Sequence, residues 1–352
     1  MEEWYGRGVY ALAKPLLFGL DPETAHALAM TALGALEHGL PLRAAVRALA
    51  APPAESAVRA MGLEFRSPVG LAGGVDKIAP LARALAALGC GFLELGTVTA
   101  LAQEPNPRPN LFRLPADRAL VNRLGFPNDG AERVAARFAK IKDRVRVPVG
   151  FSIGKSRAVA VEADLAPVIA DYTRSFDAVA PVSDFVVVNV SSPNTKDLRV
   201  LQGAALAGAL LGELAKRNAG KKPLLVKIAP DLDDAEIDAI CGVVDAHGLA
   251  GVVATNTTIR REGLATAAER VEAIGAGGLS GPPLRARALD VVRRVRRALP
   301  KATVIGVGGI ERGEDARAML DAGADLVQIY TAFVYRGPFA ARKIATELLH
   351  CK

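Results

Sequence analysis

The sequence predicts an α/β fold, the TIM (β/α)8 barrel, in which eight parallel strands alternate with helices. Short apolar runs recur eight times between residues 69 and 329, with helical patterns between them. Nearly every run ends in small, polar or cationic residues, as is typical of the strand ends where barrel enzymes place their chemistry. The chain has 352 residues, 51% of them hydrophobic, which suffices for one large barrel. A doubly wound parallel sheet is the alternative.

Residues 1–42 predict a helical extension that precedes the barrel. The first stretch has apolar residues at roughly helical spacing, and charges such as Lys14 interrupt it, so it is neither a signal peptide nor a membrane-spanning helix. A second helix should start at Asp21, a preferred N-cap residue, with Pro22 at the first helical position. Two short amphipathic helices suit either contact with lipid or a cap packed on the barrel.

The barrel domain is assigned to residues 43–352. Its expected strands are residues 69–72, 92–96, 147–153, 185–190, 224–228, 251–254, 303–307 and 326–329. Helical patterns include residues 80–88, 131–140, 206–217, 234–247, 284–298 and 314–322. An insertion of about 50 residues separates the second and third strands, and insertions of that length in a compact domain are usually functional.

Composition argues against several function classes. The formal net charge is +7, but Lys and Arg are scattered among Asp and Glu with few aromatic residues, so no nucleic-acid partner is expected. The Arg-rich residues 285–297 predict a solvated helix face, with contact to an anionic surface as the alternative. Cys90, Cys241 and Cys351 form no CxxC motif, so we expect neither a disulfide framework nor a metal site, and a reducing cytoplasm is the default. No histidine neighbours a polar strand end, which argues against a histidine base.

The most informative stretch is residues 187–199, with the sequence VVNVSSPNTKDLR. It begins as the end of a buried strand and then presents amides and hydroxyls, among them Asn189, Ser192 and Asn194. Such groups suit a planar polar ligand that is held by hydrogen bonds and loses a proton. The alternative is a plain turn, in which the same residue types are common.

Other strand ends offer binding groups for an anion. Gly308 and Gly309 follow the seventh strand, where barrels commonly bind phosphate, and the glycine-rich loop 277–281 is either a further contact or a surface loop. Lys227 lies inside an apolar run and needs an anionic partner, such as a substrate carboxylate or a cofactor ring that becomes negative on reduction. Lys77 needs one too, unless Asp76 or Glu94 supplies it.

Four of the eight asparagines lie at the predicted barrel mouth, where the strands end. They predict a pocket that hydrogen bonds to both N–H and C=O groups of a ligand, such as those of a pyrimidine ring. They are Asn122, Asn189, Asn194 and Asn256.

At this point ten ordered motifs resemble those of the dihydroorotate dehydrogenases, specifically the membrane-associated, quinone-using class. They are LAGGVDK, ELGTVT, NPRPNLFRL, VNRLGFPN, NVSSPNTKDLR, LVKIAP, ATNTT, GGLSGPPL, GVGGI and LVQIYTAF. The resemblance implies a TIM barrel that binds FMN and oxidises dihydroorotate to orotate in pyrimidine biosynthesis. Its electrons would pass to ubiquinone or menaquinone.

The resemblance also implies roles for single residues, with Ser192 as the catalytic base that takes the proton from carbon 5 while hydride leaves carbon 6. The implied substrate-binding residues are Lys77, Asn122, Arg123, Leu124, Gly125, Phe126, Asn189, Asn194, Asn256 and Thr257. The implied FMN-binding residues are Gly73, Gly74, Val75, Asp76, Lys77, Thr97, Ser152, Asn189, Lys227, Thr255, Gly281, Gly309, Tyr330 and Thr331. Ser152 departs from the family pattern, which has asparagine there, so we expect water to bridge its shorter hydroxyl to the cofactor.

The resemblance favours the lipid-contact interpretation of the extension. His26 and Arg113 match the residues that line the quinone tunnel, and Tyr330 is expected near its inner end. The enzyme would then be a peripheral protein on the cytoplasmic face of the inner membrane, as a monomer or weak homodimer.

Three other interpretations remain open. The soluble class of the same enzyme passes electrons to fumarate or NAD, but it uses a cysteine base and lacks the extension. A non-redox barrel, an isomerase or lyase, would bind a sugar phosphate and be colourless. A flavin-binding barrel without catalysis would be yellow but would not be bleached by dihydroorotate.

Overall fold

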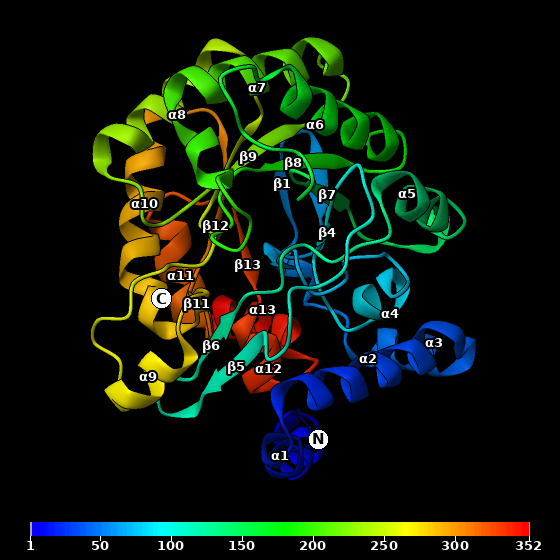
Figure 1. Cartoon of the computed structure of the whole chain (residues 1–352). Helices are drawn as coiled ribbons and strands as arrows, with labels where there is room; N and C mark the ends of the chain where they lie inside the picture. Colours follow the sequence, from blue (N-terminus) through cyan, green and yellow to red (C-terminus); the bar gives the residue numbers. More distant parts are fainter. Residues whose placement is uncertain (1, 352) are drawn as a thin grey trace.

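The chain folds as a TIM barrel, which confirms the predicted fold class (Figure 1). The structure is a computed structural model that describes the backbone of residues 2–351 and the side chains of residues 10–351. Within this part of the chain, eight strands close into a barrel, and each strand is parallel to its neighbours. In barrel order these are β3 (Val69–Leu71), β4 (Leu93–Val98), β7 (Val149–Ile153), β8 (Phe185–Asn189), β9 (Leu224–Ile228), β10 (Gly251–Ala254), β12 (Thr303–Val307) and β13 (Leu326–Ile329).

Apolar side chains fill the N-terminal half of the barrel interior. Phe92 packs edge-on against Phe65 and Phe185, with ring centroids 5.3 and 6.3 Å apart. A hairpin of β1 (Val58–Ala60) and β2 (Leu63–Phe65) contributes Phe65. Because side chains alternate along a strand, the face of β8 that buries Phe185 also carries Asn189 at its C-terminal end. The interior is therefore apolar at one end and polar at the other.

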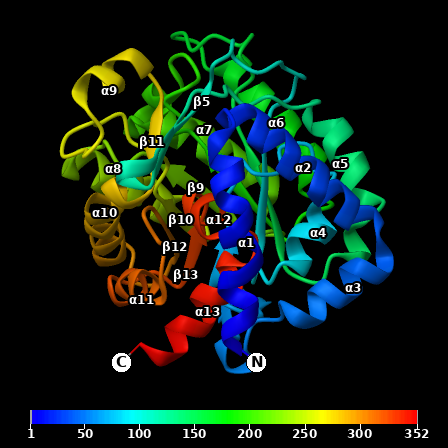
Figure 2. The same cartoon turned by 90° about the horizontal axis from the view of Figure 1, so that it is seen from below.

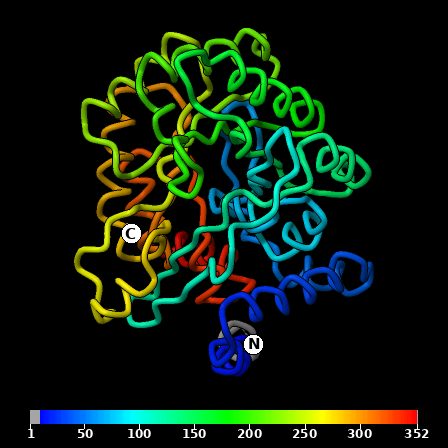
Figure 3. The backbone as a smooth tube through the Cα atoms, in the orientation of Figure 1, coloured from blue at the N-terminus to red at the C-terminus, as the bar shows by residue number. Residues whose placement is uncertain are grey.

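Helices surround the barrel (Figure 3). They are α4 (Ala82–Ala87), α5 (Ala131–Ala139), α6 (Ala166–Val179), α7 (Ala204–Asn218), α8 (Asp234–Ala246), α10 (Arg285–Ala298), α11 (Gly313–Asp321), α12 (Thr331–Arg336) and α13 (Ala340–His350). Six of them, α4, α5, α7, α8, α10 and α11, correspond to the predicted helical patterns. Short 3-10 helices are η1 (Ala54–Ser56), η2 (Pro115–Asp117), η3 (Lys142–Arg144), η4 (Leu198–Gln202) and η5 (Pro282–Leu284). On the Arg-rich α10, Arg294 pairs with Asp234 and Asp238 of α8, as expected for a solvated face.

The N-terminal extension contains α1 (Glu2–Gly19), α2 (Pro22–His38) and a third helix, α3 (Leu40–Leu49). Asp21 caps α2 as predicted and accepts the backbone N–H of Thr24 at 2.9 Å. The prediction of two helices was incomplete, since α3 follows α2 after Gly39 and the expected boundary after residue 42 falls inside it. Figure 2 shows α1 lying across the lower side of the barrel. Within residues 2–351, none of the helices combines the length and the apolar character that a membrane span requires.

A small antiparallel sheet covers part of the barrel mouth. It pairs β5 (Leu111–Leu114) and β6 (Ala119–Asn122), both from the predicted insertion, with β11 (Gly278–Ser280), which follows α9 (Ala268–Ile274). Asn122 lies at the end of β6, opposite Leu111 and Gly278. The insertion thus brings an amide side chain over the strand ends.

Candidate active site

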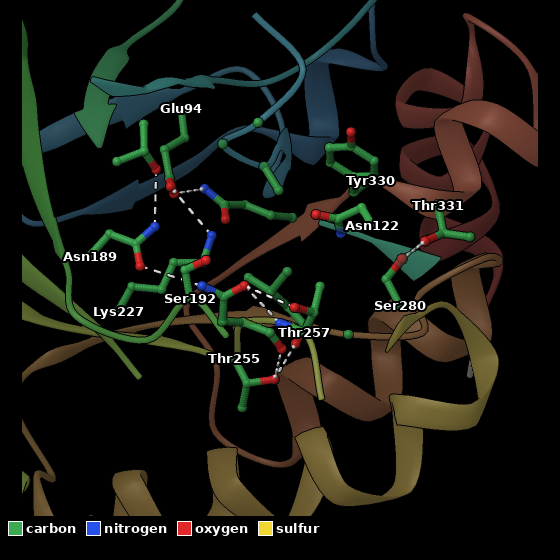
Figure 4. A pocket seen from close by; sticks show the side chains of 18 of the residues that line it. Glu94, Asn122, Asn189, Ser192, Lys227, Thr255, Thr257, Ser280, Tyr330 and Thr331 are labelled. Atoms are coloured by element: carbon green, nitrogen blue, oxygen red, sulfur yellow. Dashed lines mark hydrogen bonds and ion pairs between the residues drawn. The ribbon is translucent and has the colours of Figure 1, made fainter. Parts of the chain in front are cut away.

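A polar cavity opens at the C-terminal ends of the barrel strands (Figure 4). Most of the residues predicted for substrate and cofactor line it. These are Gly73, Gly74, Lys77, Thr97, Asn122, Leu124, Gly125, Phe126, Asn189, Ser192, Asn194, Lys227, Thr255, Asn256, Thr257, Gly281, Gly309, Tyr330 and Thr331. Strand ends far apart in the sequence therefore converge on one space, as the barrel prediction requires.

The four predicted asparagines meet in this cavity. Asn194 donates its amide to Asn122 Oδ1 at 3.1 Å, which joins the β8 loop to the covering sheet. Asn189 donates to Thr97 Oγ1 at 3.0 Å, and its Oδ1 accepts the amide of Asn256 at 3.4 Å. The amides are thus fixed by one another, while the cavity that they line presents donors and acceptors to a ligand.

Ser192 lies at this amide cluster and is 5% exposed. Its hydroxyl oxygen accepts the backbone N–H of Asn194 at 3.2 Å. A hydrogen bond donated to the oxygen favours its negatively charged form. Three residues along, Thr195 Oγ1 is buried without a hydrogen-bond partner among the described residues. The loop therefore carries the Ser192 hydroxyl, whose oxygen accepts a hydrogen bond, and the Thr195 hydroxyl, which can donate one to a ligand or to water.

Lys227 has an anionic partner, as predicted, but this partner is the side chain of Glu94 rather than one of the ligands suggested for it. Its ammonium lies 3.3 Å from Glu94 Oε1, and both side chains are almost completely buried. Gln328 donates to Glu94 Oε2 at 2.8 Å, whereas Gln328 Oε1 has no partner among the described residues. The barrel interior therefore carries a paired cation and one unpartnered acceptor, and all three of these residues line the cavity.

Lys77 makes neither of the salt bridges that were weighed for it. Its ammonium donates to Gly74 O at 2.5 Å, while Asp76 accepts the backbone N–H of Leu81 at 2.9 Å. Burial lowers the pKa of Lys77 to about 8, and burial raises the pKa of Asp76 to about 6. A partly buried cation that lines a cavity, and whose hydrogen bond within the described residues goes to a neutral carbonyl, suits an anionic ligand.

Glycines shape the part of the cavity beside Ser280 and Thr331. Gly309 has a φ of +69°, and a Cβ there would lie 2.6 Å from Arg285 Cβ. Gly281 has a φ of +105°, and a Cβ would lie 2.9 Å from Arg118 O. Between these loops, Ser280 and Thr331 share a hydrogen bond of 2.8 Å. The result is a cradle of backbone and hydroxyl groups of the kind that binds phosphate.

A second, largely apolar groove lies between the N-terminal helices and the barrel. All three residues predicted for the quinone tunnel line it, namely His26, Arg113 and Tyr330. Tyr330 lines the polar cavity as well, so both spaces border on this residue. The pKa of His26 is lowered to about 4, mainly by desolvation and to a smaller extent by the positive charge of Lys77. Its neutral ring is accessible from the groove. Arg113 donates to Leu17 O at 3.0 Å and stacks on Phe18, so it joins α1 to β5.

Comparison with known proteins gives the family. A family model described as dihydroorotate dehydrogenase matches residues 56–351. The chain belongs to the dihydroorotate dehydrogenase family. It is 52% identical, over 97% of its length and 98% of the relative's, to a dihydroorotate dehydrogenase (quinone) of Clavibacter michiganensis. A protein of the same name from Rhodococcus erythropolis is 50% identical, with 96% of this chain and 93% of that one covered.

Solved structures agree with this family. The crystal structure of a dihydroorotate dehydrogenase from Eimeria tenella in complex with ferulenol superposes with a TM-score of 0.81 at 34% identity. The match covers 95% of this chain and 94% of that one, so it includes most of the N-terminal extension.

Four residues carried over from the dihydroorotate dehydrogenase pattern do not line the polar cavity, namely Val75, Asp76, Arg123 and Ser152. Ser152 is fully buried and shares a hydrogen bond of 2.9 Å with Thr97 Oγ1, so it acts on the cavity only through Thr97. The Arg123 side chain donates to Ile274 O and Ala276 O, so it holds the loop after α9. Val75 instead lines the apolar groove.

Among the polar residues that line the cavity, three were not predicted individually, although one of them, Ser280, lies in the loop 277–281 that was weighed as a contact. Glu94, Ser280 and Gln328 line the cavity beside the predicted groups. Glu94 was considered only as a partner of Lys77. A charged residue within an apolar strand predicts a functional role, and this holds for Glu94 in β4 as much as for Lys227 in β9. Gln328 gives the same signal within β13. The polar residues of buried strands were the available clue.

Proposed function

We propose that this chain oxidises dihydroorotate to orotate and passes the electrons to a membrane quinone, a step of pyrimidine biosynthesis. The observation that carries the proposal is that one residue, Tyr330, lines both the polar cavity and the apolar groove. A redox cofactor beside this residue would exchange electrons with a polar substrate on one side and an apolar acceptor on the other. Close relatives carry the same name, dihydroorotate dehydrogenase (quinone).

The cofactor that fits the cavity is FMN. The glycine cradle around Gly281 and Gly309, with Thr331, would hold its phosphate, and Gln328 Oε1 would accept an N–H of its ring. Lys227 would favour the reduced anion, and the remaining contacts would come from Gly73, Gly74, Lys77, Thr97, Asn189, Thr255 and Tyr330. When bound, the flavin supplies an acceptor for two electrons as hydride.

The substrate would lie against the asparagine cluster. Asn122, Asn189, Asn194, Asn256 and Thr257 would bind its amides and carboxylate, and Lys77 would balance its negative charge. Ser192 would remove the proton from carbon 5, assisted by the N–H of Asn194 that supports its oxygen. Thr195, whose hydroxyl has no hydrogen-bond partner in the part of the chain that the structure describes, is our candidate for passing that proton on.

The N-terminal helices would dock on the membrane as a peripheral anchor. Leu12 and Leu16 of α1 are 78% and 77% exposed, and Leu28, Leu40, Leu42 and Leu49 add to this apolar surface. Exposed apolar residues in such number on neighbouring helices mark a surface that binds lipid or a partner. We place this surface at the cytoplasmic face of the inner membrane, where ubiquinone or menaquinone would enter the groove. Helices α1 to α3 would then act as the quinone module of the chain.

A turnover assay with three acceptors tests the proposal. Purified protein with dihydroorotate should reduce a short-chain quinone, whereas fumarate and NAD should give no turnover. Equal turnover with fumarate or NAD would support the soluble class instead, and turnover with none of the three would refute the proposed reaction.

A further inference from the structure

Three consecutive loops at the barrel mouth are held together by one arginine that the proposed chemistry does not use. Arg199 lies in η4, downstream of Ser192, and its side chain is 22% exposed. It does not line the polar cavity. Its partner Asp231 follows β9 and is 14% exposed.

Each nitrogen of the Arg199 guanidinium donates to a different loop. Nε donates to Ser191 O at 3.1 Å, in the loop after β8. Nη1 donates to Asp231 Oδ2 at 2.8 Å, after β9, and Nη2 donates to Thr257 O at 3.0 Å, after β10. Ser191 O belongs to the peptide group that links Ser191 to Ser192. The planar guanidinium of arginine can donate to three separate acceptors at once, whereas the ammonium of lysine concentrates its charge on one nitrogen.

Asp231 completes the arrangement from the other side. Its Oδ1 accepts the hydroxyl of Thr258, and its Oδ2 accepts the backbone N–H of Ile259 at 3.2 Å. The carboxylate therefore orients the guanidinium and at the same time fixes the segment that carries Asn256 and Thr257. Asn256 is in turn hydrogen bonded to Ser191 Oγ at 3.0 Å, so the two segments are coupled on the cavity side too.

We infer that Arg199 and Asp231 are positioning residues that hold the base Ser192 in register with the substrate-binding residues Asn256 and Thr257. This inference rests on the proposed function. Neither residue lines the polar cavity, so they would serve the reaction only by holding the backbone segments that carry Ser192, Asn256 and Thr257. A displacement of about 1 Å at a reacting group can cost on the order of 100-fold in rate.

The experiment compares Arg199→Lys and Asp231→Asn in the full-length holoenzyme. Flavin reduction by dihydroorotate and flavin reoxidation by a quinone are measured separately by rapid mixing. We expect the saturating rate of flavin reduction to fall roughly 10- to 100-fold in R199K and about 10-fold in D231N. Reoxidation by quinone and flavin content should stay within about twofold, because the apolar groove is untouched. The double variant should resemble R199K alone, since the two residues act as one unit.

Arg217→Lys is the matched control, because Arg217 makes a bidentate pair with Asp177 on the outer surface, away from both cavities. Added guanidinium should partly restore flavin reduction in Arg199→Ala and should change nothing in Arg217→Ala. Flavin reduction in R199K and D231N at the rate of R217K would overturn the inference. So would a parallel loss of both half-reactions and of bound flavin, which would show a general folding role. Absence of bleaching in the unchanged protein would instead refute the proposed function.

Discussion

One buried ion pair links helix α2 of the N-terminal extension to the barrel. Glu37, near the end of α2, is 2% exposed and accepts Arg83 Nε at 2.5 Å, and the Arg83 side chain is 13% exposed. The other carboxylate oxygen accepts the backbone N–H of Ala84 at 2.6 Å. Ala84 lies in the first turn of α4, where N–H groups lack helical partners. We predict that Glu37→Ala loosens α2 from the barrel.

The expected cost follows from what the substitution leaves behind. Arg83 would remain as a buried cation without its carboxylate, and removal of one partner from a buried pair typically costs about 3–5 kcal/mol. In the variant, Arg83 would keep its hydrogen bond of 3.3 Å to the backbone carbonyl of residue 37. We therefore expect the free energy of unfolding to fall by about 3 kcal/mol, the lower end of that range. Glu37→Gln loses the charge and keeps only one of the two acceptor oxygens, so a cost of about 1–3 kcal/mol is expected.

The assay combines urea unfolding with the two half-reactions. Because α2 also carries His26, E37A should raise the KM for quinone while flavin reduction by dihydroorotate is unchanged. Glu64→Ala is the matched control, since the Arg59–Glu64 pair is 83% and 74% exposed and should contribute less than about 1 kcal/mol. If E37A destabilises the protein no more than E64A and leaves quinone kinetics unchanged, the reasoning is wrong.

Three further predictions concern the site and the membrane surface. Ser192→Ala should slow flavin reduction by dihydroorotate by roughly 10²- to 10⁴-fold while orotate still binds, and an unchanged rate would exclude Ser192 as the base. Burial lowers the pKa of Lys77 to about 8, and the ammonium is lost as pH rises, so orotate affinity should fall roughly tenfold per pH unit above about 8. A flat profile from pH 7 to 9.5 in an orotate titration would show that Lys77 does not neutralise the ligand. Leu12→Gln with Leu16→Gln should weaken binding to phospholipid vesicles in a sedimentation assay without changing the spectrum of the bound flavin, whereas equal vesicle binding would place the membrane contact elsewhere.

The barrel strands were predictable because each is a short apolar run bounded by polar residues. The expected limits of β9, β10, β12 and β13 match the structure residue for residue. The site was predictable for a related reason, since parallel strands bring their C-terminal ends together and polar residues stood at nearly all of them. Helix α3 was missed because its Pro41 and scattered arginines look like a linker, although Pro is well tolerated in a first helical turn.

Long-range polar contacts were not predictable from the sequence. Glu94 and Lys227 are 133 residues apart, and only the closure of the barrel places them on one interior face. The same holds for Glu37 and Arg83, and for Arg199 and Asp231. No local pattern links such partners, since the topology rather than the spacing decides which charges meet.

If one cofactor serves both the polar cavity and the apolar groove, an anaerobic spectral titration of the purified protein will reveal both half-reactions. The purified protein should show a flavin spectrum, lose its visible absorption when dihydroorotate is added, and recover it when a quinone follows. Bleaching without recovery would contradict the role assigned to the groove. A protein without flavin absorption, or one that dihydroorotate does not bleach, would refute the proposed oxidation of dihydroorotate.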